Sequence, residues 1–286
     1  MPDSYIQKIE RHIYDLVSDS SPDRPKWNIE AVRQGKESKW NYIDGCMLTA
    51  IINIYFHNND QRLLDFVEKF LDFYIFDDGT IRGYDLEEYN LDNISGGRAL
   101  FDAYRLLKKQ KYQLAIERLY QQIKTQPRTD QGSFWHKKIY PHQVWLDGLY
   151  MALVFYARYE TEFNNCQNYA DIIKQFENAR KYMYDDIKKL YYHGYDSKKQ
   201  MFWCKKDGCS KNFWLRSMGW YVMALCDVLE YLKSRREKEY IAKLLKEALD
   251  GLLRYQDPKS GMFWQVIDKG GKGGNYLETS GSAMIA

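Results

Sequence analysis

Apolar residues recur at intervals of three and four along most of this chain, the spacing that places them on one face of a helix. Two kinds of helical segment alternate. The more polar kind carries charged residues on its opposite face, and we expect such helices over residues 61–74, 111–123, 169–183 and 240–255. Because a helix with one charged face suits the outside of a domain, these segments are predicted to form an outer layer.

The other kind of segment begins with a recurring phrase, in which a small or acidic residue and a glycine precede an alanine-bearing apolar run. Its copies read "YIDGCMLTAI", "NISGGRALFDA", "WLDGLYMALVF", "RSMGWYVMALC" and "TSGSAMIA". The spacing between their glycines leaves room for two helices and two connections per unit; these glycines are Gly45, Gly97, Gly148, Gly219 and Gly281. The sequence therefore predicts helical hairpins whose apolar helices form an inner layer, arranged as a closed α/α toroid or as an open solenoid.

The connections between the two layers differ in length. Those that lead from a polar helix to an apolar one are long and aromatic, whereas the reverse connections are short. Function is therefore expected on one face only, where the long loops gather. The Phe-Trp pairs at 134–135, 202–203 and 263–264 lie in these loops and either stack on sugar rings or pack beneath the loops.

Asp147 stands out within the third copy, in "YPHQVWLDGLYMAL". Pro141 suits the first turn of a helix, so the helix is expected to begin there. On that helix Asp147 shares a face with Val144, Met151 and Val154. A carboxylate in such a setting is costly without a partner or a chemical role, so Asp147 either caps the helix start or is functional.

Composition and charge exclude several classes of protein. The chain has 286 residues, of which 45% are hydrophobic, enough to bury a sizeable core. Its net charge of +3 is spread over helix faces rather than gathered in a basic stripe, so no nucleic-acid partner is expected. The amino-terminal segment is amphipathic, and no run reaches the ~20 apolar residues that span a bilayer. We expect a cytoplasmic protein with no membrane partner.

No sequence pattern for a cofactor is present. The five cysteines have no paired spacing, so neither a disulfide framework nor a zinc site is indicated. The chain also lacks a Gly-rich phosphate loop and a His, Asp or Glu cluster with metal-ligand spacing. We therefore expect no metal or other cofactor, and the oligomeric state stays open.

Four phrases in order resemble one enzyme family: "YPHQVWLDGLYM", "YYHGYDSKKQMFW", "FWLRSMGWY" and "ETSGSAM". From about Trp40 to the last residue, the chain resembles glycoside hydrolase family 105, the unsaturated rhamnogalacturonyl hydrolases, and the related unsaturated glucuronyl hydrolases of family 88. The resemblance implies an all-α (α/α)6 barrel, forming one catalytic domain over residues 1–286. Since "ETSGSAMIA" begins an inner helix and stops after about one turn, the chain is expected to lack the last helices of that barrel.

The resemblance also implies a reaction. Members of the family remove a 4,5-unsaturated uronic acid from oligosaccharides left by polysaccharide lyases, such as those of pectin. An aspartic acid protonates C4, water adds at C5, and the product rearranges so that the bond to the next sugar breaks. This aspartate matches Asp147, whose apolar neighbours are expected to raise its pKa and keep a proton available near neutral pH.

Further site residues follow from the same match. Asp92 corresponds to a second catalytic carboxylate, although its place before Asn-Ile-Ser also suits an N-cap. Asp44 is its equivalent in the first repeat and is read as supporting a helix start only. Arg216 is expected to grip the uronate carboxylate, with an ordinary ion pair as the alternative. The residues predicted to bind the substrate are Tyr42, His136, Lys137, His193, Trp214, Arg216 and Trp220.

Two other functions stay open at this stage. An array of helical hairpins is also the architecture of scaffolds that bind a peptide or protein on their concave side. A sugar epimerase on a similar toroid would need a pair of catalytic histidines, which His12, His57, His136, His142 and His193 do not clearly supply. The sugar next to the uronate is not specified by the sequence, and rhamnose is implied only by the resemblance.

Overall fold

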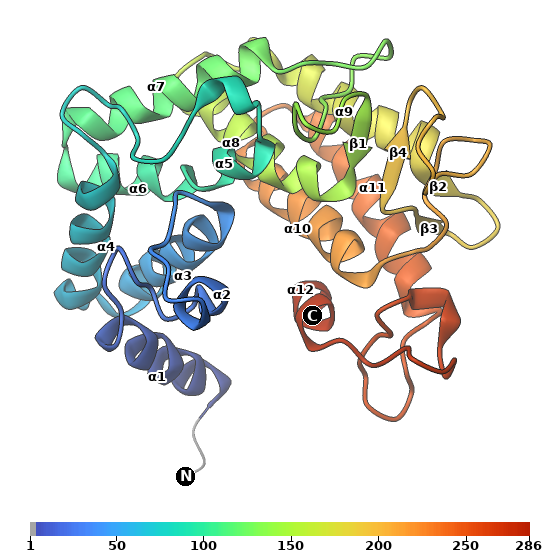
Figure 1. The fold of residues 1–286 in the computed structure, drawn as a ribbon, viewed down its shortest axis with the longest axis horizontal. Coiled ribbons are helices and arrows are strands. Elements are labelled where there is room, and N and C mark those ends of the chain that lie inside the picture. Colours follow the sequence, from blue (N-terminus) through green and yellow to red (C-terminus); the bar gives the residue numbers. More distant parts are fainter. Residues whose placement is uncertain (1–3) are drawn as a thin grey trace. The chain divides into compact units, whose positions relative to one another are not determined.

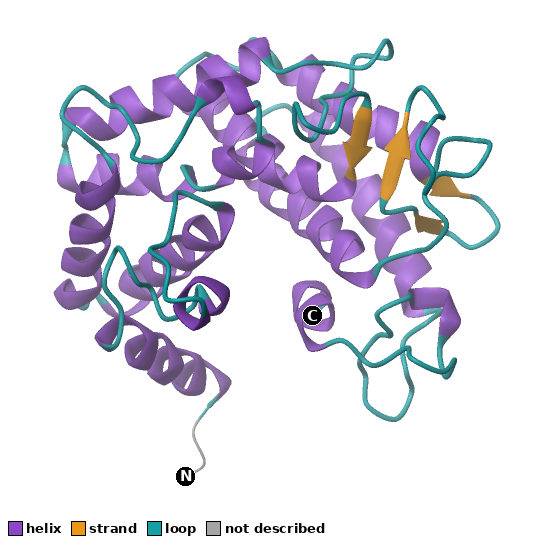
Figure 2. Cartoon of the chain, in the orientation of Figure 1, coloured by secondary structure: helices purple, strands orange, loops and turns teal. Residues whose placement is uncertain are grey.

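The computed structural model describes residues 4–286, which are mainly helical with a few short strands (Figure 2). The chain divides into two compact units. Unit 1 comprises residues 4–86 and 92–124, and unit 2 comprises residues 87–91 and 125–286. Each unit is described by itself.

Unit 1 is built around a hairpin of α3 (Tyr42–Asn58) and α4 (Gln61–Tyr74), and α6 (Arg98–Leu107) packs against both helices (Figure 1). Its core consists of aliphatic and aromatic residues of these helices that are almost completely buried, among them Leu48, Ile51, Leu63, Phe70 and Phe101. The remaining helices of the unit are α1 (Tyr5–Ser18), α2 (Ile29–Arg33) and nearly all of α7 (Gln110–Thr125). Two short elements cross the boundary between the units, η1 (Leu86–Glu88) and α5 (Leu91–Ser95).

Unit 2 contains two hairpins and a further inner helix. The first hairpin is α8 (Leu146–Glu162) with α9 (Tyr169–Met183), and the second is α10 (Leu215–Tyr231) with α11 (Arg235–Leu253). Helix α10 also packs against α8 and α12 (Thr279–Ile285), while α9 contacts α11 (Figure 1). The loops contain β1 (Gln143–Trp145), β2 (Tyr184–Asp185), β3 (Leu190–Tyr191), β4 (Gly194–Asp196) and η2 (Ile267–Lys269).

The predicted alternation of outer and inner helices is confirmed. The polar segments 61–74 and 169–183 coincide with α4 and α9, and the segments 111–123 and 240–255 lie almost wholly in α7 and α11. Helix α8 is the most enclosed inner helix, since nearly all its residues from Leu146 to Glu160 are buried. The long loops do lead from outer to inner helices, and only two residues separate α3 from α4.

Close approach between inner helices explains the repeated glycines. A Cβ atom on Gly45 would lie 2.2 Å from the carbonyl oxygen of Ser95, in the element that precedes α6. In unit 2, a Cβ on Gly281 would lie 2.5 Å from Cγ of Leu215, at the start of α10. Any side chain at these two positions would push the neighbouring inner segments apart, so glycine is needed there.

One prediction of a helix boundary is wrong. The helix that carries Asp147 begins at Leu146, not at Pro141, because residues 143–145 form strand β1 and pair with β4. His142 has a φ of 63°, which ends any helix started at Pro141. In the second copy, Gly96 and Gly97 separate α5 from α6, so the glycine precedes the apolar helix, as predicted.

Asp44 of unit 1 is a buried carboxyl group. Its side chain accepts hydrogen bonds from Trp27 Nε1 at 2.8 Å and Asn41 Nδ2 at 2.9 Å, and Asn41 provides the cap of α3. Burial raises the pKa of Asp44 to about 7, although these hydrogen bonds oppose the shift. Asp44 thus has a structural role at the start of α3, as the sequence indicated.

This raised pKa predicts that stability falls with increasing pH. Between the ordinary pKa of 3.8 and about 7, the folded chain binds more protons at Asp44 than the unfolded chain, so raising the pH through this window weakens folding. Urea unfolding followed by circular dichroism should show a lower midpoint at pH 8 than at pH 5. Asp44→Asn should reduce this difference, whereas Asp65→Asn, at an exposed position of α4, should leave it unchanged. An equal pH dependence in the Asp44 variant and the wild type would contradict the assignment.

Candidate active site

Asp147 lies in the first turn of α8, and a strand pair brings His193 to it. Strand β1 runs antiparallel to β4, with Trp145 opposite Gly194, and Leu146 N donates a hydrogen bond to the carbonyl oxygen of His193 at 3.1 Å. His193 Nε2 is 3.2 Å from Asp147 Oδ2. The two side chains are 28% and 23% exposed, and Asp147 Oδ2, the oxygen that faces His193, is buried.

His136 also lies close to the start of α8. Its Nδ1 atom is 2.9 Å from the place where a Cβ on Gly148 would stand, so glycine in this copy of the repeat makes room for the imidazole. The main chain of His136 is held at both ends, because its N–H donates to Gln143 O and its carbonyl accepts from Leu91 N. Its ring stacks on Trp145 with 4.8 Å between centroids.

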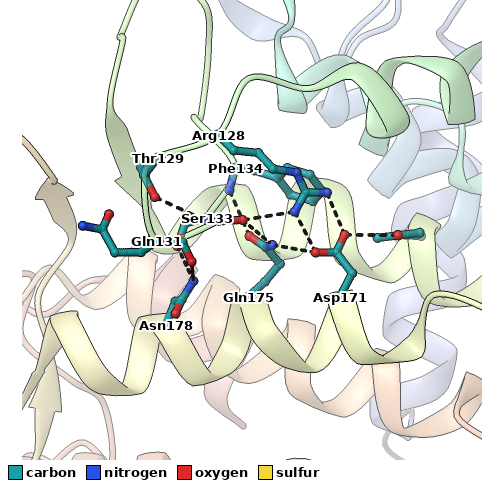
Figure 3. A network of polar contacts seen from close by, with 10 residues as sticks. Arg128, Thr129, Gln131, Ser133, Phe134, Asp171, Gln175 and Asn178 are labelled. Atoms are coloured by element: carbon teal, nitrogen blue, oxygen red, sulfur yellow. Dashed lines mark hydrogen bonds and ion pairs between the residues drawn. The ribbon is translucent and has the colours of Figure 1, made fainter.

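A polar network attaches the loop that leads to His136 to the outer helix α9 (Figure 3). Arg128 donates two parallel hydrogen bonds of 2.7 Å to Asp171. Gln175 accepts from Phe134 N at 2.9 Å, and Asn178 donates to Ser133 Oγ at 2.9 Å. The contacts of Gln175 and Asn178 are buried and the Arg128–Asp171 pair is partly exposed, and together they hold the loop that leads to His136 against α9.

The expected raised pKa of Asp147 is wrong for this structure. Burial does raise the pKa, but the hydrogen bond and charge of His193, with a further contribution from His136, lower it more. The net effect holds the pKa of Asp147 below its ordinary value. The carboxylate is therefore ionised at neutral pH, as one partner of an Asp–His pair.

A pocket of about 390 Å³ is lined by His193 of this pair, and Asp147 lies behind the histidine, outside the lining. Trp145 and Trp214 stand on two sides of His193, with ring centroids 5.3 and 5.6 Å from its ring. The remaining lining comes from the loop between β4 and α10 and from its ends; the full lining is Trp145, His193, Gly194, Phe202, Trp203, Ser210, Lys211, Asn212 and Trp214. Phe202 is 88% exposed, which is unusual for a phenylalanine without a ligand or partner.

The three Phe-Trp pairs have different roles. Phe202 and Trp203 line the pocket, as expected for residues that stack on sugars. Phe134 and Phe263 are instead buried, and Phe134 also lies against the guanidinium of Arg128. The packing alternative therefore holds for these two phenylalanines.

Arg216 is not a free cation at the start of α10. Its Nη1 donates to Glu278 Oε1 at 2.8 Å, and its guanidinium carbon lies 5.4 Å from the Trp214 ring centroid. The arginine side chain is 42% exposed, whereas Glu278 is only 5% exposed. The ion-pair alternative is thus realised, although the exposed part of the guanidinium is still accessible to a second anion.

The other predicted residues lie in different surroundings. Lys137 follows His136 and is half-buried, and Trp220 is buried, with its ring 4.7 Å from that of Tyr150. Trp220 does not contribute to the pocket lining. Tyr42 and Asp92 belong to unit 1, Tyr42 at the first position of α3 and Asp92 inside the first turn of α5 rather than at its cap.

Five residues of the pocket lining were not singled out from the sequence: Trp145, Gly194, Ser210, Lys211 and Asn212. Trp145 lies in the phrase that carries Asp147, so an aromatic signal was present there. Lys211 and Asn212 carry no local signal of this kind. Among residues 4–286, no group of three or more metal-binding side chains is placed to hold a metal ion. No helix in that range is both long and apolar enough to cross a membrane.

Comparison with known proteins identifies the family. The profile of Glycosyl Hydrolase Family 88 matches residues 17–286. The chain belongs to this family. The family 88 chain is 24% identical over 254 residues to the unsaturated rhamnogalacturonyl hydrolase YesR of Bacillus subtilis (strain 168), a match that covers 86% of this chain and 69% of YesR.

Solved structures agree with this assignment. A family 105 glycoside hydrolase from C. acetobutylicum ATCC 824 has 41% sequence identity and a TM-score of 0.86, covering 95% of this chain and 74% of its own. The unsaturated glucuronyl hydrolase of Bacillus sp. GL1 shares the fold at 14% identity, with a TM-score of 0.60 over 87% of this chain and 66% of its own. These comparisons confirm the predicted fold class, an all-α fold of the (α/α)6-barrel type. They also confirm the prediction that the chain is a glycoside hydrolase. The prediction of a single catalytic domain over residues 1–286 stays a prediction.

Proposed function

We propose that this family 88 hydrolase removes a 4,5-unsaturated uronic acid from lyase-generated oligosaccharides by hydrating the C4=C5 double bond. The Asp147–His193 pair beside an aromatic pocket is the observation that carries this proposal. An acid–base pair suits the two proton transfers of a hydration, and flat indole rings suit the faces of sugar rings. YesR, the relative named above, is an unsaturated rhamnogalacturonyl hydrolase, which supports rhamnogalacturonan disaccharide as the first substrate to test.

The reaction proceeds in three steps. A proton from the Asp147–His193 pair goes to C4, and the positive charge that develops at C5 is shared with the ring oxygen. Water then adds to C5, and its proton returns to Asp147. The resulting hemiketal opens by breaking the bond between C5 and the ring oxygen, and the hemiacetal left at C1 releases the next sugar as an alcohol.

Substrate binding itself supplies a reason for Asp147 to become protonated. His193 helps to hold the pKa of Asp147 below its ordinary value. A bound uronate brings a second negative charge and excludes water from the pair, and both effects favour the neutral form of Asp147. Asp147 thus becomes protonated, and able to act as the acid, when the substrate is bound. Asp92 stays a predicted second carboxylate of the reaction.

A panel of disaccharides tests the proposal. Unsaturated disaccharides prepared with different lyases, and their saturated counterparts, are incubated with the chain, and released sugars are separated by chromatography. We expect release from unsaturated substrates only, with the fastest release identifying the second sugar. Equal release from saturated disaccharides would indicate ordinary glycosidic displacement and overturn the proposal.

Arg216 is predicted to hold the carboxylate of the uronate. Arg216→Ala removes a charge-assisted contact worth roughly 1.5–3 kcal/mol, so kcat/KM should fall on the order of tenfold to a hundredfold. The ion pair with buried Glu278 adds a second expectation, which is a lower melting temperature, because the variant leaves that carboxylate without its cation. Arg216→Ala, Glu278→Gln double replacement should restore stability but not kcat/KM. Recovery of both would assign Arg216 to structure alone.

A further inference from the structure

Lys211 introduces a positive charge into the aromatic pocket. It lines the pocket, and its side chain is exposed. The pocket lining contains no aspartate or glutamate. Among residues 4–286, no ion pair or hydrogen bond joins the Lys211 ammonium to a carboxylate. A cationic group in a pocket without a counter-charge is suited to meet a negatively charged ligand.

Three neighbouring cations, Lys198, Lys205 and Arg216, differ from Lys211 because they already have partners. Lys205 of the same loop is 3.0 Å from Asp207 and lies over the Tyr192 ring. Lys198 is 2.8 Å from Asp130. Arg216, which is assigned to the uronate, is paired with Glu278. Lys211 therefore adds a positive charge that is not used in an ion pair of the fold. The uronate carboxylate does not need it either, because Arg216 is assigned to that group.

The local main chain places Lys211 next to a residue that is hydrogen-bonded to Gly194, at the border of the pocket. Ser210, its neighbour in sequence, donates its N–H to Gly194 O at 2.8 Å. At Gly194, a Cβ would stand 3.5 Å from Trp145 and 3.6 Å from Trp203, so both indoles border this glycine. Asn212, which follows Lys211, accepts a hydrogen bond from Lys269 Nζ. Lys211 thus lies on a fixed segment beside the two rings.

We propose that Lys211 selects substrates with an anionic group, a carboxylate or a sulfate ester, on the sugars beyond the unsaturated uronate. This inference rests on the proposed function, because the Asp147–His193 pair defines where the uronate binds. Trp203 stacks on one of the following sugars, and the ammonium group of Lys211 contacts the anion that one of them carries. The exposed Phe202 extends the stacking surface in the same direction.

The test compares three unsaturated substrates: a disaccharide with a neutral second sugar, a disaccharide with a sulfated second sugar, and a tetrasaccharide with a second uronate. Lys211→Met keeps the length of the aliphatic chain and removes the charge. KM for one or both anionic substrates should rise about threefold to tenfold, while KM for the neutral disaccharide should stay within twofold. The substrate that responds shows whether the anion is a sulfate or a carboxylate.

Lys206→Met is the matched control, because Lys206 is an exposed lysine of the same loop that does not line the pocket. It should leave all three KM values unchanged. An equal rise of KM for all three substrates in the Lys211 variant would mean that Lys211 contacts the unsaturated uronate itself, and this would overturn the inference. Unchanged values for both anionic substrates would overturn it as well.

Binding of saturated oligosaccharides separates this inference from the proposed function. If the wild type hydrolysed no unsaturated substrate, the proposed function would fail, but calorimetry with saturated acidic and neutral tetrasaccharides would still examine the pocket. A preference for the acidic tetrasaccharide that Lys211→Met abolishes supports the inference. Equal affinity of the wild type for both tetrasaccharides contradicts it.

Discussion

Replacing Asp147 with asparagine should lower turnover by about 100-fold to 10,000-fold, the range typical of lost general acid–base catalysis. Asparagine keeps the shape of the side chain and can still hydrogen-bond to His193, but it cannot transfer a proton. Steady-state kinetics with an unsaturated disaccharide measures the loss, and calorimetry should show that the variant still binds this substrate. The far-ultraviolet circular dichroism spectrum should not change, because the side chain keeps its volume in the first turn of α8.

Asp207→Asn is the matched control for this substitution. Asp207 is an exposed carboxylate of the loop between β4 and α10, and it pairs with Lys205 rather than with a histidine. Its variant should keep wild-type turnover. Retention of more than about a tenth of wild-type turnover by Asp147→Asn would pass the acid role to Asp92.

The second large effect is expected for His193. His193→Gln places an amide nitrogen near the position of Nε2, but the amide does not carry a proton to or from Asp147. Turnover should fall at least tenfold, and the pH profile should move as well. His193 lowers the pKa of Asp147 in the wild type, so its loss leaves burial as the main influence and raises that pKa.

The direction of the pH shift follows from the protonated form that the reaction needs. Since C4 receives a proton, the rate falls as the pH rises through the pKa of Asp147 in the substrate complex. A higher pKa in His193→Gln therefore moves the alkaline limb of the residual rate to higher pH than in the wild type. If the rate of His193→Gln fell at the same alkaline pH as that of the wild type, and turnover dropped only slightly, His193 would have no role in proton transfer. It would then only pack against Trp145 and Trp214.

Much of the fold could be predicted because it depends on local periodicity. The charged stripes of α4 and α9 repeat within each helix, so both segments were located to the residue. The glycine at each inner helix start was visible as a repeat, although its reason, the close approach seen at Gly45 and Gly281, depends on a neighbouring helix. Local sequence thus specified the helices and the spacing of the hairpins.

The details that depend on distant residues could not be predicted. The start of α8 is displaced from Pro141 to Leu146 because β1 pairs with β4, about fifty residues further along the chain. The pairing of Arg216 with Glu278 joins residues separated by 62 positions. The lowered pKa of Asp147 has the same origin, because an apolar helix face suggested burial alone, whereas β4 brings His193 to the carboxylate.

The most direct test of the proposed chemistry follows the ultraviolet absorbance of the conjugated double bond during reaction with an unsaturated rhamnogalacturonan disaccharide. The bond between C4 and C5 absorbs, and the hydrated product does not. We expect the wild-type chain to remove this absorbance in proportion to the rhamnose released, and Asp147→Asn to leave it nearly constant over the same time. Constant absorbance with the wild type, or an equal loss with both proteins, would contradict hydration by the Asp147–His193 site.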